Sequence, residues 1–167
     1  AQLFADRIPA AGVRDVNHDT ADVVRIEGGV PIFHRDMDED TIPLEAGIVD
    51  RAISLTKGCY VGQEIIIRVL HRGHGRVARR LVGLAPDPSD GPPTPGARLH
   101  AGDRDSGVVT SATFSPALNR PIALGYVHRD FAEPGTRLSV RGAEGERAAT
   151  VSQLPFVGPE VTVATDS

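Results

Sequence analysis

The sequence predicts an α+β chain in which a mixed helical and extended half precedes a small antiparallel β-barrel or sandwich. Two observations predict this order. Residues 1 to about 75 alternate short helical patterns with extended pieces, whereas the following residues form short apolar runs bounded by Gly, Pro or Asp. Short strands at such spacing are typical of small all-β domains. We therefore divide the chain into residues 1–75, residues 76–157 and a loose tail, residues 158–167.

The first half opens with an expected helix and a short extended piece. The helix covers Ala21–Glu27, with Asp19 and Thr20 placed to cap its start and the pair Gly28-Gly29 placed to end it. Pro31 disfavours helix in the residue before it, so Ile32-Phe33 is expected as a short strand.

An acidic stretch follows, from Asp36 to Asp40. It resembles the start of a calcium-binding loop, but Thr41 replaces the glycine of the turn and Gly47 stands where the bidentate glutamate is needed. We therefore expect a solvated acidic loop without a metal.

Two more elements complete this half. Ala52–Leu55 is expected as a strand, and Gln63–His71 is expected as a helix. Ile65, Ile66 and Val69 would form the inward face of that helix.

The second half is expected to consist of strands joined by tight turns. The pair Gly102-Asp103 and residues 142–145 are candidates for hairpin turns. The expected strands cover residues 76–84, 97–101, 107–114, 122–128, 136–140 and 147–154.

Composition excludes several classes of function. The formal charge of −4 and the absence of Trp argue against a general nucleic-acid binder. A single Cys excludes an internal disulfide framework, and it excludes a zinc or iron–sulfur site built from this chain's thiolates alone. Without an apolar run of spanning length, no membrane segment is expected. A chain with a single cysteine suits a reducing compartment, so we expect the protein in the cytoplasm, or in the mitochondrial matrix if it is eukaryotic.

Cys59 is the candidate reactive group. It follows Lys57-Gly58 and precedes the expected helix that starts near Gly62. The positive end of a helix and the Lys57 charge both favour the thiolate, which is the nucleophilic form. A lone cysteine can equally be a buried structural residue, so both interpretations stay open.

Four other side chains have competing interpretations. Glu27 could pair with an aminopyrimidine edge, which offers two donors, or it could be a solvated helix residue. Gln63 and Glu64 could simply suit the start of a helix. Arg68 belongs to a basic stretch that could face a polyglutamate tail or an RNA phosphate, or be solvated.

The cysteine segment carries a family resemblance. The run Lys57-Gly58-Cys59-Tyr60-Val61-Gly62-Gln63-Glu64 resembles the signature of the YgfZ family, folate-dependent proteins that support iron–sulfur cluster assembly or repair. Residues 25–31 and 41–47 resemble the segment that precedes the signature, and residues 107–111 and 122–126 resemble the C-terminal barrel shared with the glycine-cleavage T-protein, an aminomethyltransferase.

The resemblance implies a fold and a site. The fold would be the tail of a folate-binding, aminomethyltransferase-like domain followed by a small antiparallel β-barrel. The ligand would be tetrahydrofolate or a derivative, with no metal held by this chain alone. The implied catalytic residues are Cys59 and Lys57. The implied folate-binding residues are Glu27, Tyr60, Gln63 and Arg68, and the remaining motif residues are Gly58, Gly62 and Glu64.

The resemblance also implies partners and leaves alternatives. The partners would be a missing N-terminal half of the same protein, iron–sulfur proteins as clients, and folate. The first hypothesis is a YgfZ-like protein that assists iron–sulfur cluster synthesis or repair. The alternatives are an aminomethyltransferase that transfers a one-carbon unit to tetrahydrofolate, and a non-enzymatic folate-binding module. Whether the chain is an enzyme stays open at this point.

Overall fold

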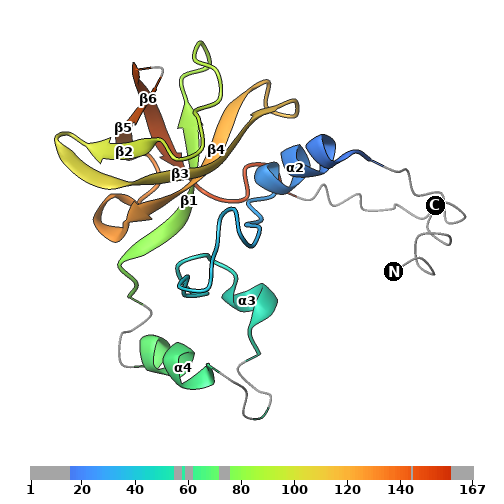
Figure 1. Cartoon of the computed structure of the whole chain (residues 1–167), viewed down its shortest axis with the longest axis vertical. Coiled ribbons are helices and arrows are strands. Elements are labelled where there is room, and N and C mark those ends of the chain that lie inside the picture. Colours follow the sequence, from blue (N-terminus) through green and yellow to red (C-terminus); the bar gives the residue numbers. More distant parts are fainter. Residues whose placement is uncertain (1–15, 55–57, 59–61, 72–75, 144, 159–167) are drawn as a thin grey trace, which may run out of the picture.

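The structure is a computed structural model, and it describes residues 16–54, 58, 62–71, 76–143 and 145–158. Within these ranges, short helices precede six strands (Figure 1). The α-helices are α2 His18–Glu27, α3 Val49–Ala52 and α4 Gln63–His71. The strands are β1 Arg79–Pro86, β2 Arg98–Ala101, β3 Arg104–Ser115, β4 Arg120–His128, β5 Arg137–Gly142 and β6 Gly145–Ser152. A 3₁₀ turn, η2 Arg129–Phe131, follows β4.

The six strands close into a barrel, which decides between the two architectures left open by the strand pattern. The order around the barrel is β1-β4-β3-β2-β5-β6, and all neighbours are antiparallel. Both expected hairpins are present, because Ala101 pairs with Arg104 and Gly142 pairs with Gly145. The sequence prediction of an α+β chain that ends in a small antiparallel barrel is therefore confirmed.

Strand β4 is buried on both faces, which explains its nearly continuous apolar sequence. Ala123 and Val127 face the barrel core. Ile122 and Leu124 pack on the other side, in a smaller cluster with Ile26 of α2. The barrel core also contains Val82, Leu84, Ala97, Leu99, Val109, Leu138, Val140, Ala149 and Val151. One strand thus joins the barrel interior to the helix that packs outside it.

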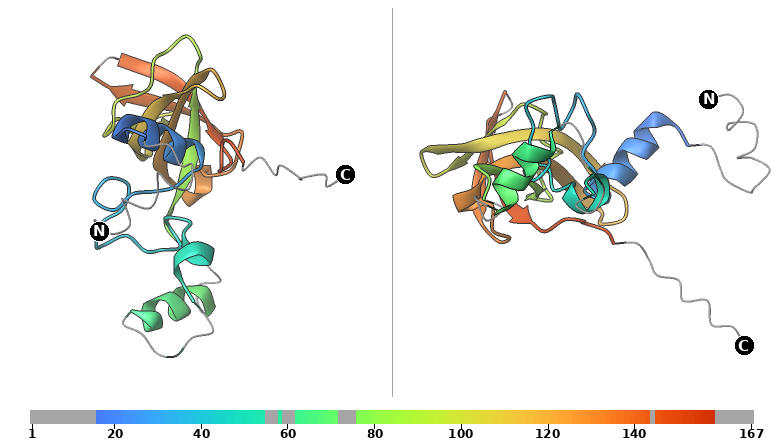
Figure 2. Two further views of the ribbon diagram at one scale, coloured as in Figure 1. Left: turned by 90° about the vertical axis from the view of Figure 1, so that its right-hand side faces the viewer. Right: turned by 90° about the horizontal axis from the view of Figure 1, so that it is seen from below.

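The segment after β6 returns to α2 and covers this smaller cluster. Leu154 and Phe156 pack against it, and the backbone N–H groups of Phe156 and Val157 donate to the Glu27 carbonyl at 2.9 and 3.0 Å. These bonds satisfy a carbonyl that the helix end leaves without an internal partner. Figure 2 shows this segment passing beside the helix.

Several local expectations were wrong. Helix α2 begins earlier than expected, and its N-cap is Asn17, whose Oδ1 accepts from the Thr20 N–H at 2.8 Å. Ala52 lies in α3 rather than in a strand, because hydrogen bonds to Ile48 and Val49 close a single helical turn there. The expected strand at residues 32–33 reduces to one isolated bridge, between Phe33 and Met37, since no strand among the described residues extends this pairing.

The bounds of α4 match the prediction, Gln63–His71. Ile66 on its expected inward face is buried. The side chains of Ile65 and Val69 lie outside the described part of the chain. Among the helices that the structure describes, none is long and apolar enough to cross a membrane.

Gly107 provides a test of the barrel packing. A Cβ at this position would collide with the carbonyl oxygen of Tyr126 on the neighbouring strand β4. Gly107→Ala should therefore lower the free energy of unfolding by about 2 kcal/mol or more, as overpacking of a tight site does. Urea unfolding measures the change. Gly91→Ala is the matched control, because a Cβ there meets no atom within 4 Å. Equal stability of the two variants would contradict the packing.

Candidate functional site

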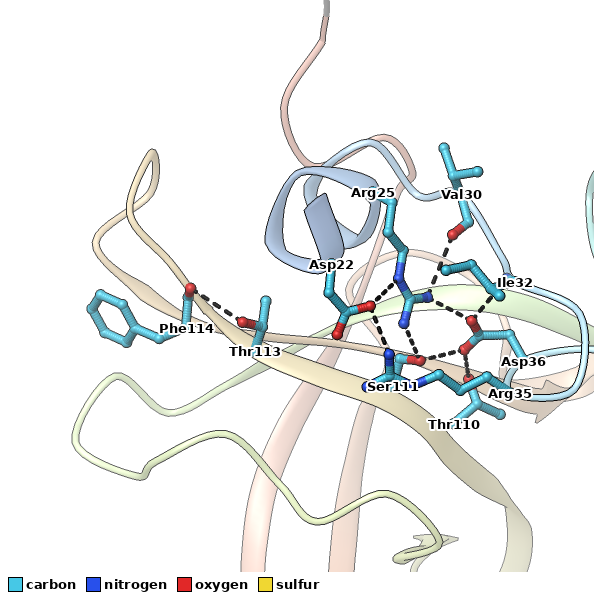
Figure 3. Close-up of polar contacts among 10 residues, drawn as sticks. All are labelled: Asp22, Arg25, Val30, Ile32, Arg35, Asp36, Thr110, Ser111, Thr113 and Phe114. Atoms are coloured by element: carbon cyan, nitrogen blue, oxygen red, sulfur yellow. Dashed lines mark hydrogen bonds and ion pairs between the residues drawn. The ribbon is translucent and has the colours of Figure 1, made fainter. Parts of the chain in front are cut away.

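A buried carboxylate, Asp36, forms the centre of a polar network on the outside of the barrel (Figure 3). Its side chain is fully buried. Oδ1 accepts from the hydroxyls of Thr110 at 2.5 Å and Ser111 at 2.7 Å. Oδ2 accepts from Nη1 of Arg25 at 2.5 Å and from the Ile32 N–H at 3.0 Å. Four donors thus compensate the loss of water around this charge.

Arg25 carries the network from the barrel to α2. Its side chain is 9% exposed, and its Nη2 donates to the Ser111 hydroxyl at 2.7 Å. Its Nε donates to Asp22, one helical turn earlier, at 2.7 Å. Asp22 in turn accepts from Arg35 at 2.8 Å. The helix, the loop after it and strand β3 are therefore joined by one set of charge-assisted hydrogen bonds.

The expectation of a wholly solvated acidic loop was wrong at Asp36. The loop turns back on itself, with the Asp36 N–H donating to the Ile32 carbonyl at 2.8 Å, and this turn directs the carboxylate toward β3. Glu39 and Asp40 are exposed, as expected of a solvated loop. Within the described residues, no group of three His, Cys, Asp or Glu side chains is placed to hold a metal.

Glu27 is half-buried at the end of α2 and is held by the turn after β3. Its Oε1 accepts from the Ser115 hydroxyl at 2.5 Å and from the Ala117 N–H at 3.3 Å. Ser115 itself is fully buried. The described residues donate no hydrogen bond to Oε2, so this second oxygen can still accept from a ligand.

A cavity of about 300 Å³ lies beside the Asp36 network. Tyr126 and Arg79 line it, and the Arg79 guanidinium lies 4.7 Å from the centre of the tyrosine ring. Nε of Arg79 also donates to Glu45 at 2.9 Å, and this hydrogen bond raises the pKa of the guanidinium. Burial raises the pKa of Tyr126 to about 12, so the phenol remains a neutral donor.

The motif residues that the structure describes lie at the start of α4. Gly58 and Gly62 are exposed, and the φ of Gly62 is +86°, a conformation that favours glycine. Gln63 is half-buried. Arg68 pairs with Glu64 at 2.8 Å on an exposed face, so the proposed folate-binding arginine already has a local partner.

Three predicted site residues, Lys57, Cys59 and Tyr60, lie outside the described part of the chain. Their roles remain predictions. Figures 1 and 2 show α4 apart from the barrel, whereas α2 packs on it. The structure therefore does not bring Glu27 together with Gln63 or Arg68.

Sequence reasoning missed the partners of Glu27 and the centre of the polar network. Asp36 was assigned to a solvated loop, and Arg25, Thr110 and Ser111 appeared only as parts of a resemblance. Ser115 also carried no local signal, since a serine before a proline is common in turns. The available sign was the run 110–113 on strand β3, because its three hydroxyl residues, Thr110, Ser111 and Thr113, indicate that polar partners are needed there.

Comparisons with known proteins agree with this fold. Residues 79–158 match the family model described as the glycine cleavage T-protein C-terminal barrel domain. The aminomethyltransferase of Thermosynechococcus vestitus is 37% identical over 147 residues, which cover 88% of this chain and 39% of that protein. The aminomethyltransferase of Saccharopolyspora erythraea is 35% identical over 156 residues, which cover 93% and 41%. The chain spans about two fifths of the length of these relatives.

A solved structure extends the match beyond the barrel. The glycine cleavage system aminomethyltransferase T from Bartonella henselae superposes with a TM-score of 0.78 at 28% identity, over 94% of this chain and 44% of that one. Residues 79–158, which contain the six strands, are thus similar to the C-terminal barrel domain of the glycine cleavage T-protein, and α2 lies outside that match. These relatives are similar to the chain over 88 to 94% of its length, so the likeness is not confined to the barrel. They are named aminomethyltransferases, so they favour that alternative over the YgfZ hypothesis.

Replacement of Asp36 tests the polar network. Asp36→Asn leaves the buried Arg25 without its main counter-charge and turns an amide toward groups that are already donors. Breaking a buried pair in this way should cost about 3 kcal/mol or more of unfolding free energy. Urea unfolding measures it, with the exposed Asp40→Asn as a control that should change stability by less than about 0.5 kcal/mol. A neutral Asp36→Asn would contradict the network.

The buried phenol predicts a dependence of stability on alkaline pH. The pKa of Tyr126 is about 12 in the folded chain, above the value near 10 of an unfolded tyrosine. The unfolded chain therefore releases this proton first, so the contribution to stability is complete below about pH 10 and is lost as pH rises toward 12. Urea unfolding between about pH 9 and 11 should show a shallower loss for Tyr126→Phe than for the wild type. Identical slopes would contradict the prediction.

Proposed function

We propose that this chain forms the C-terminal part of a folate-dependent aminomethyltransferase, which moves a one-carbon unit onto tetrahydrofolate. The names of its relatives support this activity. The observation on which the proposal depends is the geometry of Glu27. One oxygen of its carboxylate is fixed by the barrel, and the other can accept from a ligand.

The aminopyrimidine edge of a reduced pterin fits this carboxylate. Such an edge presents neighbouring N–H donors, and Oε2 would accept from them through its two lone pairs. A hydrogen bond to an ionised carboxylate is stronger than one to a neutral acceptor. Ser115 and Ala117 would act by holding the Glu27 side chain in one rotamer, which lowers the entropy cost of binding. The nitrogen nucleophile that receives the one-carbon unit belongs to the folate. The chain's own residues would bind and orient it.

The cysteine motif supports a second candidate. The run from Lys57 to Glu64 favours a YgfZ-like protein that assists iron–sulfur cluster synthesis or repair, with iron–sulfur proteins as clients. In that case Cys59 would act as a thiolate beside bound folate, and Lys57 would lower its pKa. A single thiolate cannot hold a cluster, so a partner protein or another part of the same protein would supply the remaining ligands.

Binding of tetrahydrofolate tests the role of Glu27. Glu27→Gln removes the ionised acceptor, and it should weaken tetrahydrofolate binding to the full protein by roughly tenfold or more. Ser115→Ala should weaken it less, since it loosens the carboxylate and leaves its charge. Calorimetry measures both. Glu133→Gln is the matched control, because that glutamate is exposed and belongs neither to the motif nor to the Asp36 network. Unchanged affinity in Glu27→Gln would contradict the proposed contact.

Cys59 distinguishes the two candidates. A YgfZ-like role predicts rapid iodoacetamide labelling of Cys59 with a midpoint below the free-thiol pKa of about 8.5. The same role predicts that Cys59→Ser no longer assists iron–sulfur cluster synthesis or repair. An aminomethyltransferase should keep its glycine-cleavage turnover in Cys59→Ser, because its proposed ligand contact is Glu27. A labelling midpoint at or above the free-thiol value would argue against the activated cysteine.

A further inference from the structure

A second cavity, of about 360 Å³, lies on the barrel away from the Asp36 network. Its apolar walls come from the end of β1 and from β6, mainly Ala85, Pro86 and Ala148–Thr150. Two arginines line it, Arg120 from β4 and Arg137 from β5. The two guanidinium groups bring positive charge to one hollow of the barrel surface.

Arg120 is held in place but is incompletely satisfied. Its Nη2 donates to the carbonyl of Pro86 at 3.1 Å, which anchors the head group at the cavity. Its Nε is buried and has no hydrogen-bond acceptor among the described residues. A buried donor without an acceptor costs free energy, and a bound acceptor would recover it.

Arg137 supplies the second charge. It lies at the start of β5, opposite Thr150, and is exposed. No carboxylate in the described part of the chain pairs with it. Its five N–H donors are therefore available to a ligand.

Asp87 is the acidic residue in the lining, and one of its two carboxylate oxygens already accepts hydrogen bonds from a neighbouring residue. Oδ1 accepts from the backbone N–H and the hydroxyl of Ser89 at 3.0 and 2.7 Å. These hydrogen bonds, and to a smaller extent the Arg120 charge, lower the pKa of Asp87. The lining thus combines two cations with one anion, and it carries a net positive charge. The other cavity, beside Tyr126, has two arginines and two aspartates in its lining, so its charges balance.

We propose that this cavity binds a small oxyanion, a carboxylate or a phosphate, between Arg120 and Arg137. The planar forks of the two guanidinium groups match the oxygens of either group. The alanine and proline side chains of the lining would accept the carbon part of a larger ligand. Neither arginine bonds to Glu27 or Asp36, so the inference stands independently of the proposed function.

Titration of the ¹⁵N-labelled chain tests the site. Sodium phosphate and sodium acetate are added in separate NMR experiments, with sodium chloride at matched ionic strength as the reference. Amides near Ala85 and Ala149 should shift and saturate with at least one of the two anions. Saturation with phosphate alone, with acetate alone or with both identifies the oxyanion that is preferred.

A variant of Arg137 tests whether the arginine side chains bind the anion. Arg137→Gln should weaken the affinity by roughly tenfold, because a charge-assisted hydrogen bond is lost. Arg51→Gln, on α3, makes the same change in net charge and should leave the affinity unchanged. Linear shifts that match those of chloride would overturn the proposal. So would equal affinities of the Arg137→Gln variant and the wild type.

Discussion

The arrangement of this protein depends on one buried interaction, the contact of the Asp36 carboxylate with Arg25 and two barrel hydroxyls. A buried ion pair stabilises a fold only when its remaining hydrogen-bonding groups are also satisfied. Here all four acceptor positions of the carboxylate are filled, and Ser111 both donates to Asp36 and accepts from Arg25. The network fixes the angle of α2 on the barrel. Because Glu27 lies two residues beyond Arg25, its position follows from the same contact.

The apolar contact and the polar contacts of this helix end come from three consecutive residues. Ile26 is fully buried against Ile122 and Leu124, while its neighbours Arg25 and Glu27 reach polar groups of β3 and its turn. Apolar burial supplies stabilisation that has little directional preference. The hydrogen bonds select one orientation from those that burial alone would permit. The Glu27 carboxylate must meet a ligand at a fixed angle, so it depends on both the apolar burial and the hydrogen bonds.

The sequence predicts elements whose signals are local, and it fails where the partner is distant. Helix α4 has an apolar period and a glycine at its start, and its bounds were predicted correctly. The strands were found because turn residues separate them, although barrel closure depends on the β1–β6 pairing, which has no local sign. Asp36 bonds to residues 74 and 75 positions away, so an acidic loop was the natural expectation. Glu27 was identified as a candidate, but its partner Ser115, 88 positions away, was not.

The tie between α2 and the end of the barrel has a consequence for synthesis on the ribosome. The helix is made before any strand, yet its polar partners on β3 follow 86 or more residues later, and Phe156, which bonds to the Glu27 carbonyl, comes after the last strand. Contacts so distant in sequence close slowly. The nascent helix therefore lacks the partners of Ile26 on β4 until that strand is made, and the cluster is complete only once Phe156 has followed. A chaperone that shields exposed apolar side chains would act mainly during that interval.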